Sequence, residues 1–301
     1  MNRLGIVLSY SMKLLCVACG TPSIPGIDAI HCDTVPTRQQ LRPVDELARQ
    51  ALPHDPTPSL DEIAAQPNVR HLGHPQPAPQ HPSEPVRLIV CGSDAALSAV
   101  LTRLMRADTM WVEVAFMPTG KSLTTFGLVD AGQAVDAVAV PTPVVRNDLG
   151  TVVAGAATIT NMDRRTEISG EIIVDDHVLV HHGADPAARF FGTFGARLVP
   201  MMDAPGIAAV RLTSPLEADP PSGPFAGREP EERQRLAALP VVGKQMRGAV
   251  TGLSDPTSVC TGRAVQAGGE NLGVTIDGIA HPRPLTRVTF YRHLRDMQIV
   301  R

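Results

Sequence analysis

Six residues in two short loops have the side chains and the spacing needed to bind a phosphate group. A glycine lets backbone N–H groups come close to an anion, and serine hydroxyls and a lysine ammonium donate hydrogen bonds to phosphate oxygens. The pattern is therefore able to attract an anion such as a nucleotide phosphate. The six residues are Gly92, Ser93, Asp94, Gly120, Lys121 and Ser122.

Each of these loops follows an apolar run that has the composition of a β-strand. Residues 86–90 and 111–117 predict two strands, and apolar residues at a spacing of three to four between 97 and 105 predict a helix with one buried face. A helix that opens directly after a strand presents free backbone N–H groups and the positive end of its dipole. In a parallel β-α-β unit the two loops lie at the same edge of the sheet, where ligands commonly bind. An ordinary βα unit without a ligand would show the same pattern.

The order of these motifs resembles the diacylglycerol kinase catalytic domain family, which is related to bacterial lipid kinases and NAD kinases. In that family a Gly-Gly-Asp-Gly-Thr loop precedes a helix, and a Pro-x-Gly-Thr-Gly-Asn-Asp loop follows the next strand. This chain has Gly92-Ser-Asp-Ala-Ala96 and Pro118-Thr-Gly-Lys-Ser122 at those places. The resemblance implies that both loops hold ATP, with magnesium as its ion and a lipid as the phosphate acceptor.

Several residues differ from the family pattern. Ser93 and Ala95 stand where the family has glycines, and each added Cβ restricts the backbone. The second loop lacks the Asn-Asp pair, and Lys121 adds a cation. Two functions therefore stay open: an ATP-dependent lipid phosphotransferase, or a catalytically inactive pseudokinase that serves as a ligand-sensing or protein-interaction module.

Asp277 is the candidate catalytic residue late in the chain. It follows the apolar run 272–276 and precedes Gly278, and lipid kinases of the family carry an Asp-Gly-Glu element at this place on a β-rich second domain. The resemblance implies that Asp277 is the general base for the acceptor hydroxyl, although Ile279 replaces the glutamate. The residues alone also predict a plain hairpin turn, because Asp-Gly is a favoured pair in two-residue turns.

The predicted fold class is α/β plus β, with a truncated doubly wound α/β nucleotide-binding domain followed by a β-rich, sandwich-like second domain. Residues 1–84 are expected to form a poorly ordered, proline-rich arm with short helices at 44–52 and 59–65 and a linker from Gly73 to Pro85. Residues 85–147 are expected to form the partial α/β domain, and 148–301 the β-rich domain, whose C-terminal end can return to the first domain. The first domain is expected to be truncated because no strand is predicted before residue 85.

Charge and targeting signals limit the partners and the compartment. A formal net charge of −3 without a long basic run argues against a general nucleic-acid binder. Arginines between 283 and 301 could contact a lipid phosphate or an anionic membrane surface, although a solvated strand face is the commoner explanation for such a cluster. Residues 4–18 resemble a secretion signal that Lys13 interrupts, so we expect a cytoplasmic protein rather than an exported lipoprotein. The sequence does not specify an oligomeric state.

Four residues near the N-terminus have the types found in a zinc site. Cys16 and Cys19 have the spacing of a zinc knuckle, and His31 and Cys32 follow closely. The knuckle lies in an apolar stretch rather than between turn residues, so we expect no metal site here.

Overall fold

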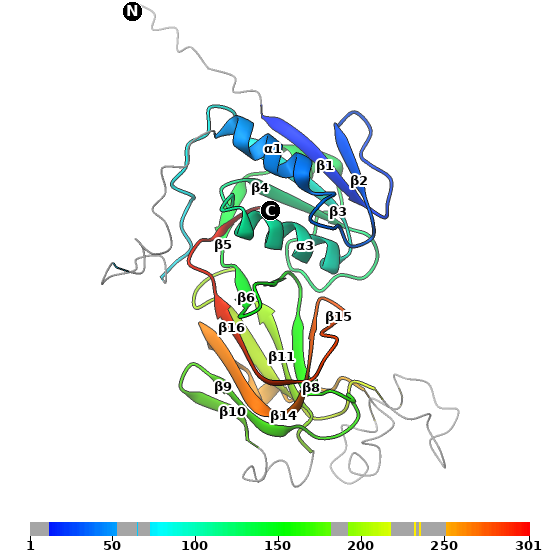
Figure 1. Ribbon diagram of the computed structural model, residues 1–301, viewed down its shortest axis with the longest axis vertical. Helices are drawn as coiled ribbons and strands as arrows, with labels where there is room; N and C mark the ends of the chain where they lie inside the picture. Colours follow the sequence, from blue (N-terminus) through cyan, green and yellow to red (C-terminus); the bar gives the residue numbers. More distant parts are fainter. Residues whose placement is uncertain are drawn as a thin grey trace, which may run out of the picture. The chain divides into compact units, whose positions relative to one another are not determined.

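The computed structural model describes residues 12–52, 73–181, 192–217 and 251–301, together with residues 65, 232 and 235. The chain forms two compact units, both with more strand than helix (Figure 1). Unit 1 comprises the chain up to Thr142 and the last segment from Leu294, and unit 2 comprises Pro143–His293. The observed boundary thus lies slightly before the predicted one at 147. The helix predicted at 59–65 lies outside the described residues, apart from residue 65.

Unit 1 contains a six-stranded sheet and three helices within the described residues. In spatial order the strands run β2-β1-β3-β4-β17-β5. All are parallel to their neighbours except β5, which is antiparallel to β17. The strands are β1 (Lys13–Cys19), β2 (Ala29–Cys32), β3 (Val86–Gly92), β4 (Glu113–Pro118), β5 (Ala139–Thr142) and β17 (Met297–Val300). The helices are α1 (Arg42–Ala51), α3 (Asp94–Arg106) and α4 (Ala131–Asp136).

The central strands are apolar because both faces of this sheet are covered. All seven residues of β3 are buried, as expected of a parallel strand between two layers. Helices α1 and α3 lie side by side in front of the sheet in Figure 1, joined by an ion pair between Asp45 and Arg103. Ala134 of α4 packs on the other face, in a cluster with Cys16 and Cys91. None of the described helices is long and apolar enough to cross a membrane.

The prediction that this domain lacks upstream strands is wrong. β1 and β2 lie before residue 85, and β1 pairs with β3 over six residues. The run 13–19 does not alternate between polar and apolar residues because its later part is buried on both faces, and Lys13 interrupts nothing since it is the first residue of the strand. The predicted helix at 44–52 is confirmed as α1.

Unit 2 consists mainly of β-strands, in agreement with the β-rich second domain predicted from the sequence. Its eleven described strands form one sheet in the order β13-β12-β11-β8-β14-β16-β6-β7, with β9, β10 and β15 attached beside β14. Their bounds are β6 (Val145–Asn147), β7 (Val152–Val153), β8 (Ala157–Asn161), β9 (Ser169–Val174), β10 (His177–His181), β11 (Gly195–Pro200), β12 (Ile207–Leu212), β13 (Cys260–Gly262), β14 (Ala264–Ile276), β15 (Ile279–Ala280) and β16 (Leu285–Arg292). A short 3-10 helix, η3, covers Pro256–Ser258.

The long strand β14 organises unit 2. Its first half pairs with β9 and β16, its second half pairs with β8 and β15, and the register shifts between Gly268 and Leu272. Glycine is required at this shift, because a Cβ on Gly269 would lie 2.3 Å from the Ser169 carbonyl oxygen of β9. The sheet can therefore change direction here and enclose a single core of aliphatic side chains with Phe290.

Candidate functional site

The two predicted phosphate loops meet at the carboxyl edge of the unit 1 sheet. β3 and β4 are parallel neighbours, and Gly92 at the end of β3 is in register with Pro118 at the end of β4. The Thr119 N–H donates a hydrogen bond of 2.8 Å to the Gly92 carbonyl oxygen. The prediction that both loops lie at the ends of neighbouring parallel strands is confirmed.

Asp94 fastens the second loop to the first turn of α3. Its Oδ1 accepts a 2.6 Å hydrogen bond from the Ser122 hydroxyl, and its Oδ2 accepts a 2.8 Å bond from the Leu123 N–H. Ser93 is the N-cap of α3, and its Oγ accepts a 3.3 Å bond from the Ala96 N–H. The loops are thus held together before any ligand binds, and the negative charge of Asp94 stabilises the helix N-terminus.

The two glycines of the site have different roles. A Cβ on Gly92 would lie 2.9 Å from the Cβ of Cys19, so this glycine allows the end of β1 to pack against the loop. Gly120 has a φ of +89°, and a Cβ there would have no atom within 4 Å. The space beside Gly120 is therefore open, and the neighbouring Lys121 side chain is exposed there. This open side is where an anion could approach the backbone N–H groups of the loop.

The strand order identifies a second feature of the same edge that the sequence did not predict. From β1 the chain proceeds to β2 on one side, while β3 lies on the other side, so the order reverses between β1 and β3. Ligands of open parallel sheets bind at such a reversal, outside the carboxyl ends of the strands. Gly20 follows β1 with a φ of +63°, and its N–H donates to the Cys32 carbonyl oxygen. The signal in the sequence for this loop after β1 was the apolar run that ends at Gly20.

Asp277 lies in unit 2 and holds a neighbouring segment of backbone. It has a φ of 49° in the two-residue turn between β14 and β15, so the hairpin interpretation is confirmed. Its carboxylate accepts hydrogen bonds of 2.7–2.9 Å from three consecutive N–H groups. The donors are Ala154, Gly155 and Ala156. These contacts give Asp277 a structural role, and its role as a general base stays a prediction.

Cys16 and Cys19 have the spacing of a zinc knuckle but not its side-chain arrangement. Successive side chains of a strand point to opposite faces, so Cys16 and Cys19 of β1 lie on opposite sides of the sheet. No group of three or more potential metal ligands occurs among the described residues. Burial raises the pKa of the Cys19 thiol to about 12, so this residue is a neutral packing group at physiological pH.

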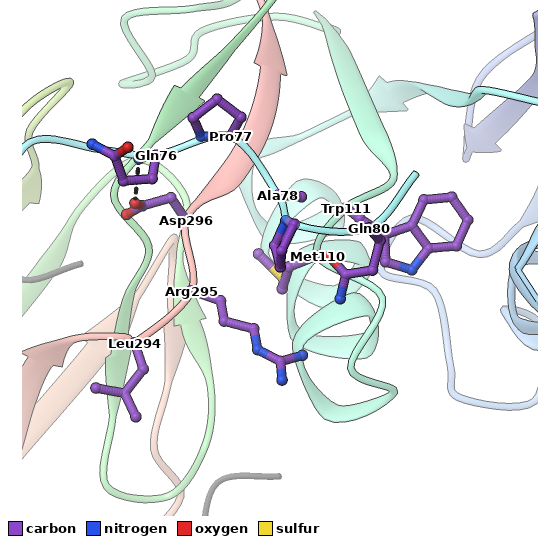
Figure 2. Close-up of a pocket in the computed structure, with 10 residues that line it drawn as sticks. Gln76, Pro77, Ala78, Gln80, Met110, Trp111, Leu294, Arg295 and Asp296 are labelled. Atoms are coloured by element: carbon purple, nitrogen blue, oxygen red, sulfur yellow. Dashed lines mark hydrogen bonds between the residues drawn. The ribbon is translucent and has the colours of Figure 1, made fainter. Parts of the chain in front are cut away.

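A small pocket of unit 1 lies away from these loops and is lined by the proline-rich segment (Figure 2). Residues 76–80, predicted as linker, line it together with Trp111 and Asp296, and its volume is about 180 Å³. The Asp296 carboxylate accepts a 2.9 Å bond from the Gln76 N–H, and Arg295 pairs with Asp108. Binding sites for small molecules usually occupy about 300 Å³ or more, so we interpret this pocket as a gap in the packing.

No protein-family model matches the chain, and no curated protein matches it in sequence. Its structure is similar to an NAD kinase from Archaeoglobus fulgidus in complex with ATP, with a TM-score of 0.37, 11% identity and coverage of 96% of this chain and 93% of that one. It is similar to a "putative diacylglycerol kinase" from Bacillus anthracis str. Sterne, with a TM-score of 0.47, 9% identity and coverage of 96% and 95%. It is also similar to yeast NADH kinase complexed with NADH, with a TM-score of 0.36, 9% identity and coverage of 96% and 83%.

All three of these proteins are named as kinases, but each TM-score is below 0.5 and each identity is 11% or less, so the resemblance of this chain to the family stays a prediction. The assignment of roles to individual residues rests instead on the local geometry of this chain.

Proposed function

We propose that this chain is a nucleotide-binding protein with a kinase-like fold, and that the carboxyl edge of the unit 1 sheet holds ATP. The observation that carries the proposal is the pairing of the Gly92 and Gly120 loops at the ends of adjacent parallel strands, with the N-terminus of α3 beside them. The first backbone N–H groups of a helix have no partner within the helix, and its dipole favours negative charge. The phosphates of ATP match both properties.

The first candidate activity is transfer of the terminal phosphate of ATP to a lipid hydroxyl. Lys121 would neutralise phosphate charge from the exposed side of the site, and the loop glycines would let the backbone approach the ligand. Magnesium would supply further charge neutralisation when bound. Asp94 is the carboxylate at this edge that could contribute to holding it, and magnesium sites commonly combine one or two carboxylates with substrate phosphates.

A second candidate is a pseudokinase that binds a nucleotide without transferring phosphate. The observation that favours it is the engagement of both candidate carboxylates. Asp94 already accepts bonds from Ser122 and Leu123. A carboxylate has about four acceptor positions, and N–H groups already occupy three of those of Asp277. A sensing or interaction module would need only the nucleotide site.

Thermal unfolding with magnesium and ATP tests the shared part of both candidates. A ligand that binds only the native protein raises its melting temperature in proportion to the logarithm of its concentration over Kd, so the wild type should be stabilised at millimolar ATP. Lys121→Ala should weaken ATP binding about tenfold, since one charge-assisted hydrogen bond contributes on the order of 1.5 kcal/mol. Leu123→Ala is the matched control, because it removes an exposed side chain of the same loop and keeps the N–H bonded to Asp94.

Transfer of labelled phosphate from ATP separates the two candidates. Labelling of a diacylglycerol, a sphingoid base or NAD would establish the phosphotransferase. Stabilisation by ATP without labelling of any acceptor would favour the pseudokinase. The absence of stabilisation by millimolar ATP would refute the nucleotide site, and with it both candidates.

A further inference from the structure

Apart from the Gly92 and Gly120 loops, unit 1 has a strongly charged site on the surface of α1 and α3. It is a polar hollow of about 520 Å³. Arginines from three parts of the chain line it: the turn before α1, α1 itself and α3. We call it the arginine hollow. Its charged residues are Arg38, Arg42, Arg49, Arg103, Asp45 and Glu46.

Positive charge exceeds negative charge in the arginine hollow. Four arginines face two carboxylates, and one of these, Asp45, is already bound by Arg103 through bonds of 2.6–3.0 Å from Nε and Nη2. Arg49 donates to the Asp45 backbone carbonyl at 3.3 Å. Among the described residues, the side chains of Arg38 and Arg42 have neither a hydrogen bond nor an ion pair, and both are exposed. Their guanidinium donors are therefore available to a ligand.

Folding alone does not account for this arrangement. Arg42 occupies the first turn of α1, where the positive end of the helix dipole disfavours a cation. Arg38 and Arg42 add like charge to a hollow that Arg49 and Arg103 already make positive, and like charges at short range destabilise a structure. A bound anion would relieve both effects.

The chemistry of guanidinium groups identifies the class of ligand. A planar guanidinium matches the oxygens of a phosphate group in a two-pronged geometry. The Asp45 carboxylate holds Arg103 in place at the wall of the hollow, since Arg103 is part-buried and forms three bonds with it. Several arginines from different elements favour a ligand that carries more than one negative charge.

We propose that the arginine hollow is a binding site for a multiply charged phosphate group, borne either by a soluble phosphorylated molecule or by a phospholipid headgroup. The hollow is built from residues outside the Gly92 and Gly120 loops, so the proposal does not depend on the nucleotide site.

Two probes test the proposal and distinguish the sources of phosphate. Inorganic pyrophosphate, titrated by calorimetry, represents the soluble ligand. Vesicles of phosphatidylcholine with and without phosphatidic acid, used in a sedimentation assay, represent the headgroup. The variant is Arg38→Gln with Arg42→Gln, and the matched control is Arg165→Gln with Arg263→Gln, which removes the same charge from exposed positions of unit 2 outside the C-terminal arginines.

We expect the wild type and the control to bind at least one probe. The Arg38/Arg42 variant should bind the same probe with an affinity lower by about tenfold or more. The affinity of the wild type should fall as the salt concentration rises. Binding of pyrophosphate would indicate a soluble ligand, and binding of only the phosphatidic acid vesicles would indicate a headgroup. Failure of the wild type to bind either probe would overturn the proposal. Equal weakening in the control would also overturn it, because the effect would then reflect net charge. A loss of ATP binding by Lys121→Ala leaves this result unchanged, so the two sites fail independently.

Discussion

Replacing Asp277 with asparagine should destabilise unit 2, and this expectation separates a structural role from a purely catalytic one. The carboxylate accepts bonds from the N–H groups of Ala154, Gly155 and Ala156. Asparagine keeps the size of the side chain but has only one acceptor oxygen, and its NH₂ group would face a donor. If Asp277 served only as a general base, Asp277→Asn would keep the fold and lose phosphate transfer.

The expected loss follows from the three bonds. In the variant, the N–H groups of Gly155 and Ala156 would still donate to the amide oxygen, but this oxygen is uncharged. The N–H of Ala154 would lose its acceptor, because the NH₂ group takes the place of Oδ2. An unsatisfied donor costs about 1–3 kcal/mol, and each charge-assisted bond loses a further fraction of that, so the free energy of unfolding should fall by about 2–4 kcal/mol. For a unit of this size the melting temperature should fall by roughly 5–15 °C.

Calorimetric unfolding and amide hydrogen exchange measure the two consequences. The exchange of the amides at 154–156 should become faster in Asp277→Asn, because these N–H groups lose protection. Asp176→Asn is the control: Asp176 lies in another two-residue hairpin, is exposed, and its carboxylate has no hydrogen bond among the described residues. Equal stability of the two variants, with unchanged exchange at 154–156, would refute the structural role.

Two further predictions concern charged contacts in each unit. The hydroxyl of Thr257 and then the guanidinium of Arg211 lower the pKa of Asp255, so its stabilising effect is present above the unfolded pKa and is lost as pH falls through the lower folded value. Asp255→Asn should therefore destabilise unit 2 by about 1–2 kcal/mol at neutral pH and by progressively less below about pH 4, as measured by urea unfolding across pH. Arg87 is buried, pairs with Glu113 and donates to carbonyl oxygens at the end of α4. Arg87→Met should lower the free energy of unfolding of unit 1 by about 3 kcal/mol or more. Urea unfolding monitored by the fluorescence of the single tryptophan measures this change, and a loss below about 1 kcal/mol would contradict the prediction.

The sequence predicted β3, α3 and β4 because the periodicity of the apolar residues changes at Gly92. These three elements follow one another in the chain and pack together, so local sequence patterns were sufficient to find them. It also placed the two phosphate loops correctly, since a parallel β-α-β unit allows one arrangement of its ends. It did not predict β1, because a strand buried on both faces has the same apolar composition as a short signal segment.

The contacts of Asp277 could not be predicted for a different reason. An Asp-Gly pair specifies a turn through its own backbone preferences, but the three N–H groups that bind this carboxylate lie more than a hundred positions earlier in the chain. The same limit applies to the arginine hollow, since nothing near Arg103 in the sequence indicates that it meets Asp45.

The position of β17 has a consequence for how the protein can be made. β17 lies between β4 and β5, and Met297 pairs with Thr142, so the sheet of unit 1 is interrupted in the chain by the whole of unit 2. During vectorial synthesis on the ribosome, β4 and β5 emerge long before the strand that joins them. Until then their facing edges lack the partner that satisfies their backbone in the finished sheet. Unit 2 can mature as a self-contained insert, whereas unit 1 closes last, and a released chain truncated after residue 293 should contain a folded unit 2 and an incomplete unit 1 sheet.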